Sequence, residues 1–119
     1  MNYETDRLVC VIENDAAHVQ FKGPDVAEYS AASQLAHDFR SLVEEFEFSV
    51  LVINCSTLTF VTSTVLEAFV STHLRCRQLG RSIRLLHPND SIREILARTN
   101  LEKVMPIYTS LEDALKTDE

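Results

Sequence analysis

Three consecutive hydroxyl side chains, Thr62, Ser63 and Thr64, are the residues best placed to do chemistry in this sequence. They follow an apolar run at residues 50–53 and precede a segment, from Val65, in which apolar residues recur every three or four positions. The first pattern predicts a buried strand and the second an amphipathic helix. The hydroxyls therefore lie at a predicted helix N-terminus, where unpaired N–H groups and the helix dipole would stabilise an added phosphate. A plain structural N-cap is the alternative interpretation.

Other reactive residue types form no catalytic or metal-binding motif. Gly23 and Gly80 are the only glycines, so neither GxGxxG nor GxxxxGK[ST], the common nucleotide-binding patterns, can be written. No GxSxG turn surrounds Ser63. The four histidines form neither an HExxH motif nor a cluster with cysteine. We therefore expect a protein that is not an enzyme and has no catalytic residues, cofactor or metal site.

Cysteine usage and net charge restrict the setting of the protein. Cys10, Cys55 and Cys76 are odd in number and include no CxxC pair, which favours a reducing cytoplasm over a disulfide framework. A net charge of −7 opposes binding to nucleic acid or to an anionic membrane surface. The N-terminus lacks a signal-peptide pattern, and no apolar run approaches the roughly 18 residues of a membrane span. We expect a cytoplasmic protein, not inserted in a membrane, whose partner is another protein.

One basic concentration interrupts this acidic sequence. It consists of Arg75, Arg77, Arg81 and Arg84. It is either the solvated end of a helix, favourably placed near the negative end of the dipole, or a docking patch for an acidic partner. Cys76 lies within it, and the neighbouring charges would lower its thiol pKa if the side chain were exposed.

The first third of the chain predicts a hairpin followed by a helix. Residues 8–12 and 17–21 read as two strands around the turn signal Asn14-Asp15. A helix from about residue 30 to 46 places Leu35, Phe39, Leu42, Val43 and Phe46 on one stripe, with Asp38 mostly away from it.

Beyond the turn formed by Thr62, Ser63 and Thr64, called here the hydroxyl turn, helices and strands continue to alternate. The predicted elements are the helix from Val65, a strand near residues 83–86, a helix at about 91–99 with a capping box at Ser91 and Glu94, a short strand near 104–108, and a last helix capped at Ser110. This order predicts one α/β domain with a mixed, largely parallel sheet, an N-terminal hairpin and about four helices. The domain should span residues 1–119, with flexible ends at 1–5 and 117–119. The strand at 49–54 should lie inside the sheet, and the next helix should pack Leu66, Phe69 and Val70 on it.

The motif at the hydroxyl turn and the order of elements resemble the STAS domain, the family of bacterial anti-sigma factor antagonists and of the cytoplasmic tails of sulphate transporters. The antagonists carry a motif Phe-(Ile/Met)-Asp-Ser-Ser-Gly-Leu, which here reads Phe-Val-Thr-Ser-Thr-Val-Leu at residues 60–66. The resemblance continues through residues 80–86, 91–101 and 106–115. Two positions depart from the family motif, because Thr62 replaces its aspartate and Val65 its glycine.

The resemblance implies a signalling module that regulates transcription. In the antagonists, the unphosphorylated domain binds an anti-sigma factor that is also a serine kinase, and phosphorylation of the motif serine weakens the complex. Carried over to this sequence, the phosphate acceptor is Ser63, with Thr62 and Thr64 as fallbacks. The implied partner-binding residues are Asp25, Thr59, Phe60, Thr62, Ser63, Thr64 and Glu67.

A second interpretation within the same family stays open. The chain would then be an unswitched STAS scaffold or adaptor, a subunit of a stress-signalling assembly or of a transporter ATPase complex. Thr62 in place of the aspartate favours this alternative. The sequence also leaves open a homodimer.

Overall fold

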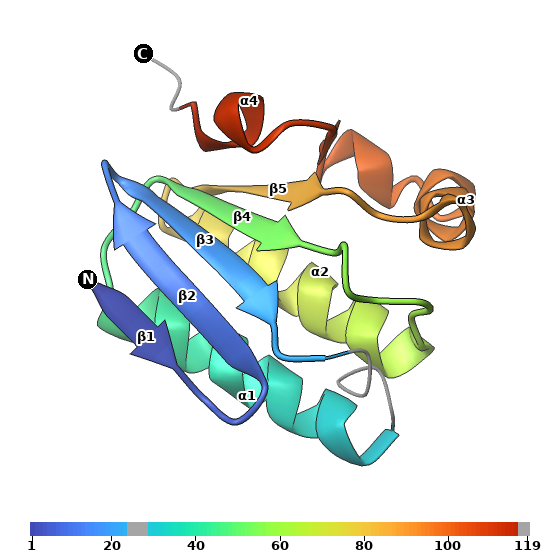
Figure 1. Ribbon diagram of the computed structural model, residues 1–119, viewed down its shortest axis with the longest axis horizontal. Coiled ribbons are helices and arrows are strands. Elements are labelled where there is room, and N and C mark those ends of the chain that lie inside the picture. The colour runs from blue at the N-terminus through green and yellow to red at the C-terminus, as the bar shows by residue number, and fades with distance from the viewer. Residues whose placement is uncertain (24–28, 117–119) are drawn as a thin grey trace.

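The computed structural model describes residues 1–23 and 29–116, and within them six strands form one sheet in chain order (Figure 1). The strands β1 to β3 are antiparallel neighbours, whereas β3 to β6 run parallel to one another. This arrangement confirms the predicted mixed, largely parallel sheet with an N-terminal hairpin. The strand bounds are β1 (Asn2–Glu4), β2 (Leu8–Glu13), β3 (Ala16–Phe21), β4 (Val50–Asn54), β5 (Ser82–Leu86) and β6 (Ile107–Tyr108).

The hairpin between β2 and β3 turns where the sequence predicts. Asn14 and Asp15 have φ values of 52° and 67°, the left-handed pair that a two-residue turn of matching twist requires. Asn and Asp tolerate this conformation better than other residues with a side chain. The register that follows places Cys10 opposite Val19 and Leu8 opposite Phe21, so these four apolar residues share one face.

Four helices of the described residues cover the sheet unevenly. Three contribute to a large core on one face, where Phe39, Phe69 and Leu96 pack with Leu51 and Ile53. The short α4 packs on the opposite face, where Ala114 meets Val50 and Val52. The helix bounds are α1 (Tyr29–Glu45), α2 (Ser63–Gln78), α3 (Asp90–Arg98) and α4 (Leu111–Leu115). Figure 1 shows α1 and α2 behind the sheet, whereas α4 lies above β5 and apart from these two helices.

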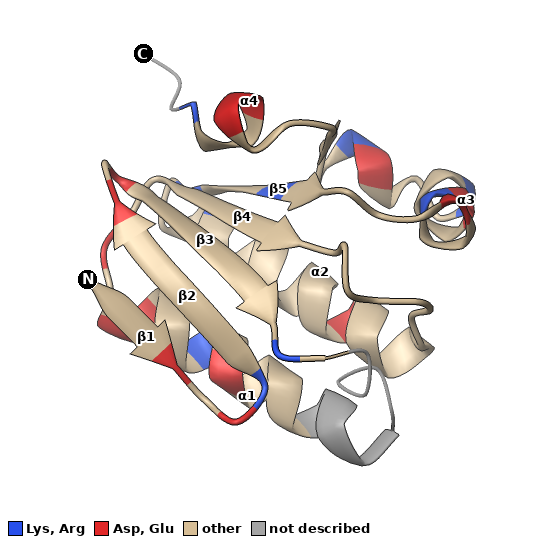
Figure 2. Cartoon of the chain, viewed as in Figure 1, with Lys and Arg blue, Asp and Glu red and all other residues tan. Residues whose placement is uncertain are grey.

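Strand β4 is buried on both of its faces and lies between β3 and β5, as predicted. Its residues 50–53 are all 2% exposed or less. No charged residue lies in β3 or β4. Apart from a basic residue within β5, Arg84, the charges lie mainly at strand ends and on helices (Figure 2). The end of β4 at Asn54 is therefore a fixed point from which the chain leaves for the hydroxyl turn.

Two details of the predicted packing need correction. The buried residues of α2 are Val65, Ala68, Phe69, Thr72 and Cys76, whereas Leu66 and Val70 are half-buried. Small residues face the core because α2 must also lie against α1, and the Thr72 hydroxyl is satisfied by the Ala68 carbonyl at 2.7 Å.

The strand β1 lies within residues 1–5, where the sequence analysis expected a flexible end. Its residues pair with β2, with Tyr3 opposite Cys10. Tyr3 also packs on Phe46 with a distance of 5.4 Å between ring centroids. This aromatic contact and the backbone pairing attach the N-terminal strand to the sheet and to the residue that follows α1.

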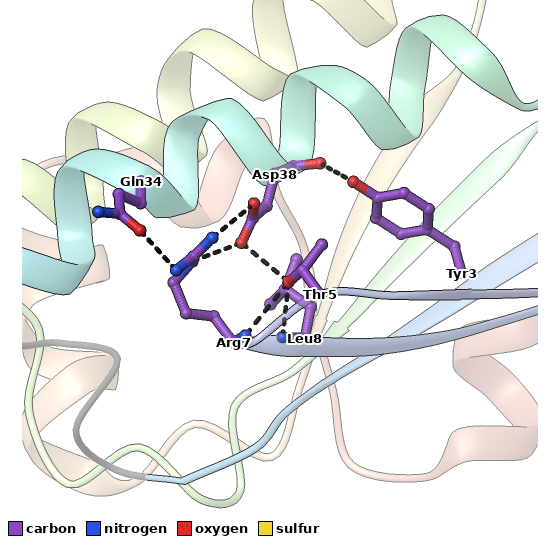
Figure 3. Close-up of polar contacts among 6 residues, drawn as sticks. All are labelled: Tyr3, Thr5, Arg7, Leu8, Gln34 and Asp38. Carbon is purple, nitrogen blue, oxygen red and sulfur yellow. Dashed lines mark hydrogen bonds and ion pairs between the residues drawn. The ribbon is translucent and has the colours of Figure 1, made fainter.

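Asp38 is 3% exposed, although the sequence pattern placed it mostly away from the buried stripe of α1. The Arg7 guanidinium binds both of its carboxylate oxygens, at 2.6 and 3.0 Å, and also donates to Gln34 (Figure 3). The Thr5 hydroxyl donates to the same carboxylate at 2.9 Å, and Tyr3 donates to the Asp38 carbonyl at 3.3 Å. The segment between β1 and β2 is thereby tied to the middle of α1.

Asp38→Asn should destabilise the fold strongly, because it leaves the Arg7 guanidinium without its paired charge. Breaking one partner of such a largely buried pair costs about 3 kcal/mol of unfolding free energy. Urea denaturation followed by circular dichroism measures this loss. Glu44→Gln is the matched control, since it breaks the solvent-exposed pair with Arg75, and its loss should be far smaller. Equal losses for the two variants would contradict a structural role for Asp38.

Candidate functional site

Ser63 is the first residue of α2, a helix of 16 residues, and Thr62 is its N-cap. The Thr62 hydroxyl accepts the N–H of Val65 at 3.3 Å, and its carbonyl accepts the N–H of Leu66 at 3.0 Å. One of the three predicted hydroxyls therefore has the structural capping role, as the alternative interpretation of the turn expected. The capping role does not extend to Ser63.

The Ser63 side chain is exposed, and Thr64 beside it is half-buried. Within residues 1–23 and 29–116, neither hydroxyl takes part in a hydrogen bond. The N–H groups at the start of a helix also lack intrahelical partners. Ser63 thus combines an accessible hydroxyl with local positive potential, the two conditions that favour a stable phosphate.

Two asparagines that the sequence analysis did not single out hold the loop of residues 55–62. The Asn54 amide oxygen accepts the N–H of Ser56 at 3.0 Å. The Asn89 amide nitrogen donates to the carbonyl of Thr59 at 3.0 Å and to that of Leu58 at 3.4 Å. Its oxygen accepts the N–H of Ile92 at 2.9 Å and so caps α3. The predicted capping box at Ser91 and Glu94 is therefore wrong, because α3 begins at Asp90 and Asn89 is its N-cap. The contact of Asn89 with the loop could not be predicted from the sequence.

The loop between these two asparagines has one buried and one exposed apolar residue. Leu58 is 2% exposed and belongs to the main core, whereas Phe60 is 46% exposed. Thr59 is also exposed. Anchoring at Leu58 and Asn89 therefore fixes the loop while Thr59 and Phe60 face solvent.

Ser63 and Glu67 line the same apolar groove on the outer side of α2. The groove has a volume of about 460 Å³, and Leu66, Val70 and Leu101 form part of its wall. Of the predicted partner-binding residues, Thr59, Phe60, Ser63 and Glu67 are exposed, and Thr62 and Thr64 are half-buried. Asp25 lies outside the described residues.

The four arginines do not form a common basic patch. Arg75 binds the Glu44 carboxylate, and Arg81 donates to the Val43 carbonyl at 2.8 Å. Arg84 is 4% exposed on the opposite face of the sheet, where it donates to the Ala114 carbonyl at 3.1 Å. The alternative of a docking patch made of all four arginines does not hold, because alternation along β5 turns Arg84 away from the α2 side.

The cysteines are buried, and burial raises their thiol pKa values. The pKa is raised to about 12 for Cys10 and Cys55 and to about 11 for Cys76, where Arg81 opposes the rise. The thiols therefore stay protonated at neutral pH, which opposes a redox role for Cys76. Among the residues described, no three His, Cys, Asp or Glu side chains gather as metal ligands. No helix in that part of the chain is long and apolar enough to cross a membrane.

Comparison with protein families decides which fold family these features represent. The model of the STAS domain matches residues 15–114. The chain belongs to the STAS domain family. The match includes the loop held by Asn54 and Asn89 and the whole of α2.

Solved structures of STAS proteins share this fold at low sequence identity. An anti-sigma factor antagonist from Mycobacterium paratuberculosis is 21% identical, with a TM-score of 0.77 over 91% of this chain and 89% of that one. The Bacillus cell fate determinant SpoIIAA, in its phosphorylated form, is 14% identical, with a TM-score of 0.69 over 89% and 95%. The STAS domain of a SulP transporter from Vibrio cholerae is 16% identical, with a TM-score of 0.66 over 88% and 81%. No curated protein sequence matches the chain significantly.

Asn89 substitutions should separate its two roles in this STAS domain. Asn89→Asp keeps an acceptor for the Ile92 N–H but cannot donate to the loop carbonyls, so exchange of the Leu58 amide proton should accelerate about tenfold with the α3 cap intact. Asn89→Ala should accelerate it similarly and also cost about 1 kcal/mol from loss of the cap. Amide hydrogen exchange by NMR and urea denaturation provide the two measurements. Unchanged Leu58 exchange in both variants would show that Asn89 does not hold the loop.

Proposed function

We propose that this STAS domain is an anti-sigma factor antagonist. It binds a serine-kinase anti-sigma factor through the loop at residues 59–60 and the start of α2, and phosphorylation of Ser63 switches the complex off. The observation that carries the proposal is the division of roles at the hydroxyl turn. Thr62 caps the helix, which leaves the exposed Ser63 hydroxyl unbonded among the described residues. The protein would act as a non-enzymatic regulator of transcription in the cytoplasm, without a cofactor.

The charge that phosphorylation adds would fall on an otherwise apolar surface. A phosphate brings about −1.5 to −2 charges at neutral pH. Glu67 lies one helical turn after Ser63 and lines the same groove, so the modified turn would carry two neighbouring anionic groups. A partner surface that fits the neutral hydroxyl would then face a desolvation cost and, if acidic, repulsion.

The two departures from the family motif are compatible with a switch at Ser63. Threonine, like aspartate, is a favourable N-cap residue, and Thr62 has that role here. Val65 is fully buried in the core and does not reach the exposed groove. Relatives in fold also support the assignment, since one is described as an antagonist and another as a phosphorylated cell fate determinant.

An unswitched scaffold or adaptor is the second candidate. It is favoured by the loss of the motif aspartate at Thr62, which removes an acidic group next to the acceptor serine. The likeness to a transporter STAS domain is consistent with it. In this case the same surface would bind a partner, and the state of Ser63 would not matter.

A binding assay with variants of Ser63 distinguishes the two candidates. The partner is a serine-kinase anti-sigma factor from the same organism, and its affinity is measured by calorimetry with Mg-ADP. Wild type and Ser63→Ala should bind equally, while Ser63→Asp should bind about tenfold more weakly because it adds negative charge at the contact. With Mg-ATP, mass spectrometry should find phosphate on Ser63 in the wild type.

Ser91→Asp is the matched control, because it adds the same charge at an exposed position of α3. It should leave the affinity unchanged. Equal binding by wild type, Ser63→Ala and Ser63→Asp, with no phosphate at residues 62–64, would contradict the switch and favour the scaffold. No binding by any variant would contradict the antagonist assignment.

A further inference from the structure

His18 contacts Asn54, the residue that holds the start of the loop at residues 55–62. Its imidazole Nε2 lies 3.5 Å from the amide nitrogen of Asn54. The amide oxygen of Asn54 is already engaged, because it accepts the N–H of Ser56 at 3.0 Å. One asparagine side chain therefore joins a histidine of β3 to the first turn of the loop that leads to Ser63.

The orientation of the Asn54 amide favours one protonation state of His18. Because the amide oxygen faces Ser56, the NH₂ group faces the ring and needs an acceptor there. Nε2 can accept only when the imidazole is neutral and carries its proton on Nδ1. A protonated ring would set two donors against each other. The amide could turn over to accept from the ring, but its NH₂ would then face the Ser56 N–H, and that hydrogen bond would be lost.

Solvent protons can reach the ring although it is half-buried. His18 lines a groove of about 330 Å³ on the face of the sheet away from α1 and α2, together with Val11, Leu111 and Leu115. In the register of the sheet, its neighbours are Val11 of β2 and Val52 of β4. Neither neighbour offers the ring a charge.

Several charged groups belong to the elements around His18. They are Glu4 of β1, Glu13 of β2, Lys22 after β3, Arg84 of β5, and Glu112, Asp113 and Lys116 in or just after α4. Glu13 lines the groove with His18 and would favour the protonated ring. Glu4 and Lys22 pair with each other at 2.6 Å, as do Asp113 and Lys116 at 3.1 Å. Arg84 binds the carbonyl of Ala114 under α4.

We infer that His18 is a proton-sensing residue that controls the conformation of the loop at residues 55–62 through Asn54. When the ring is neutral, Asn54 caps Ser56 and the loop holds Ser63 in place. When the ring is protonated, the cap breaks and the loop loosens. The effect on partner binding rests on the proposed function, whereas the coupling between His18 and Ser56 does not.

The direction of the pH dependence follows from burial. Burial lowers the pKa of His18 below its ordinary value of 6.5. The unfolded chain therefore binds more protons than the folded protein as the pH falls below 6.5, so this residue makes the fold less stable toward acid. The capped loop is expected to persist at neutral pH and to loosen under mildly acidic conditions.

NMR titration of the full chain tests the coupling without any partner. Between about pH 8 and pH 4.5, the ring ¹⁵N shifts should report a neutral Nδ1–H tautomer that becomes protonated with a midpoint below 6.5. The Ser56 amide proton should move upfield with the same midpoint. Its exchange protection should fall about fivefold to tenfold across the transition, as expected for the loss of one hydrogen bond.

Two variants make the test specific. In His18→Gln, the Ser56 amide shift should no longer change with pH. In Asn54→Ala, His18 should still titrate but Ser56 should not follow it. A Ser56 amide that ignores the His18 titration in the wild type, or that follows it equally in Asn54→Ala, would overturn the inference. If Ser56 follows His18 while no variant binds an anti-sigma factor, the coupling stands and the proposed function fails.

Discussion

Burial of β4 on both faces is the constraint on which the rest of this structure depends. Leu51 and Ile53 are enclosed by the core under α1 and α2, while Val50 and Val52 are covered from the side of α4. A strand packed from both sides cannot shift its register without moving every side chain to the wrong face. The position of Asn54, where β4 ends, is therefore set by the core, and the loop toward Ser63 begins from a defined point.

The loop combines this fixed start with a second attachment to α3. Asn54 bonds the backbone at Ser56, and Asn89 bonds it at Leu58 and Thr59. Thr62 then closes the first turn of α2. Polar side chains thus bond backbone groups of a segment that lies outside the strands and helices, and Phe60 and Ser63 remain accessible. For a binding module, such preorganisation reduces the entropy lost when a partner docks.

The same arrangement explains how one added charge could have a large effect. Ser63 lies beside the apolar wall formed by Leu66, Val70 and Leu101, where a partner would exclude water. Under the proposed switch, the helix N-terminus would stabilise a phosphate on the free protein, so the fold would tolerate the modification. A partner that must cover the phosphate gains no such compensation. Stability of the domain and strength of the complex can therefore respond differently to the same modification.

Elements defined by local patterns could be predicted from the sequence, whereas features that depend on distant contacts could not. The β2–β3 turn at Asn14, the buried run of β4 and the helix after the hydroxyl turn each have a local signature, and the family motif located Ser63. Asp38 looked like a surface residue of α1 because its partner, Arg7, lies 31 positions away. Arg84 looked like part of a basic patch. Alternation along β5 turns its side chain under α4, and this direction could not be predicted before the position of β5 in the sheet was known.

At the candidate site, exposure of the named residues can be compared with the structure, whereas their role stays a prediction. Ser63, Thr59, Phe60 and Glu67 were named from the sequence and are exposed in the structure. The residues that hold their segment were not named. Asn89 bonds the distant carbonyls of Leu58 and Thr59, which the sequence alone does not bring near. Asn54 bonds the N–H of Ser56 two residues on, a local contact that has no motif of its own here. Val65, the second departure from the family motif, lies in the core, and its burial agrees with the apolar pattern that begins at this residue.

The most direct test of the proposed binding surface is a hydrogen–deuterium exchange footprint of the complex between this protein and a serine-kinase anti-sigma factor of the same organism. Binding should slow amide exchange at residues 56–67, which span the loop held by Asn54 and Asn89 and the first turn of α2, and should leave the exchange rates in β1 and β2 unchanged. Slower exchange confined to α1 or to the face of the sheet away from α1 and α2, with residues 56–67 unaffected, would contradict the proposed binding surface.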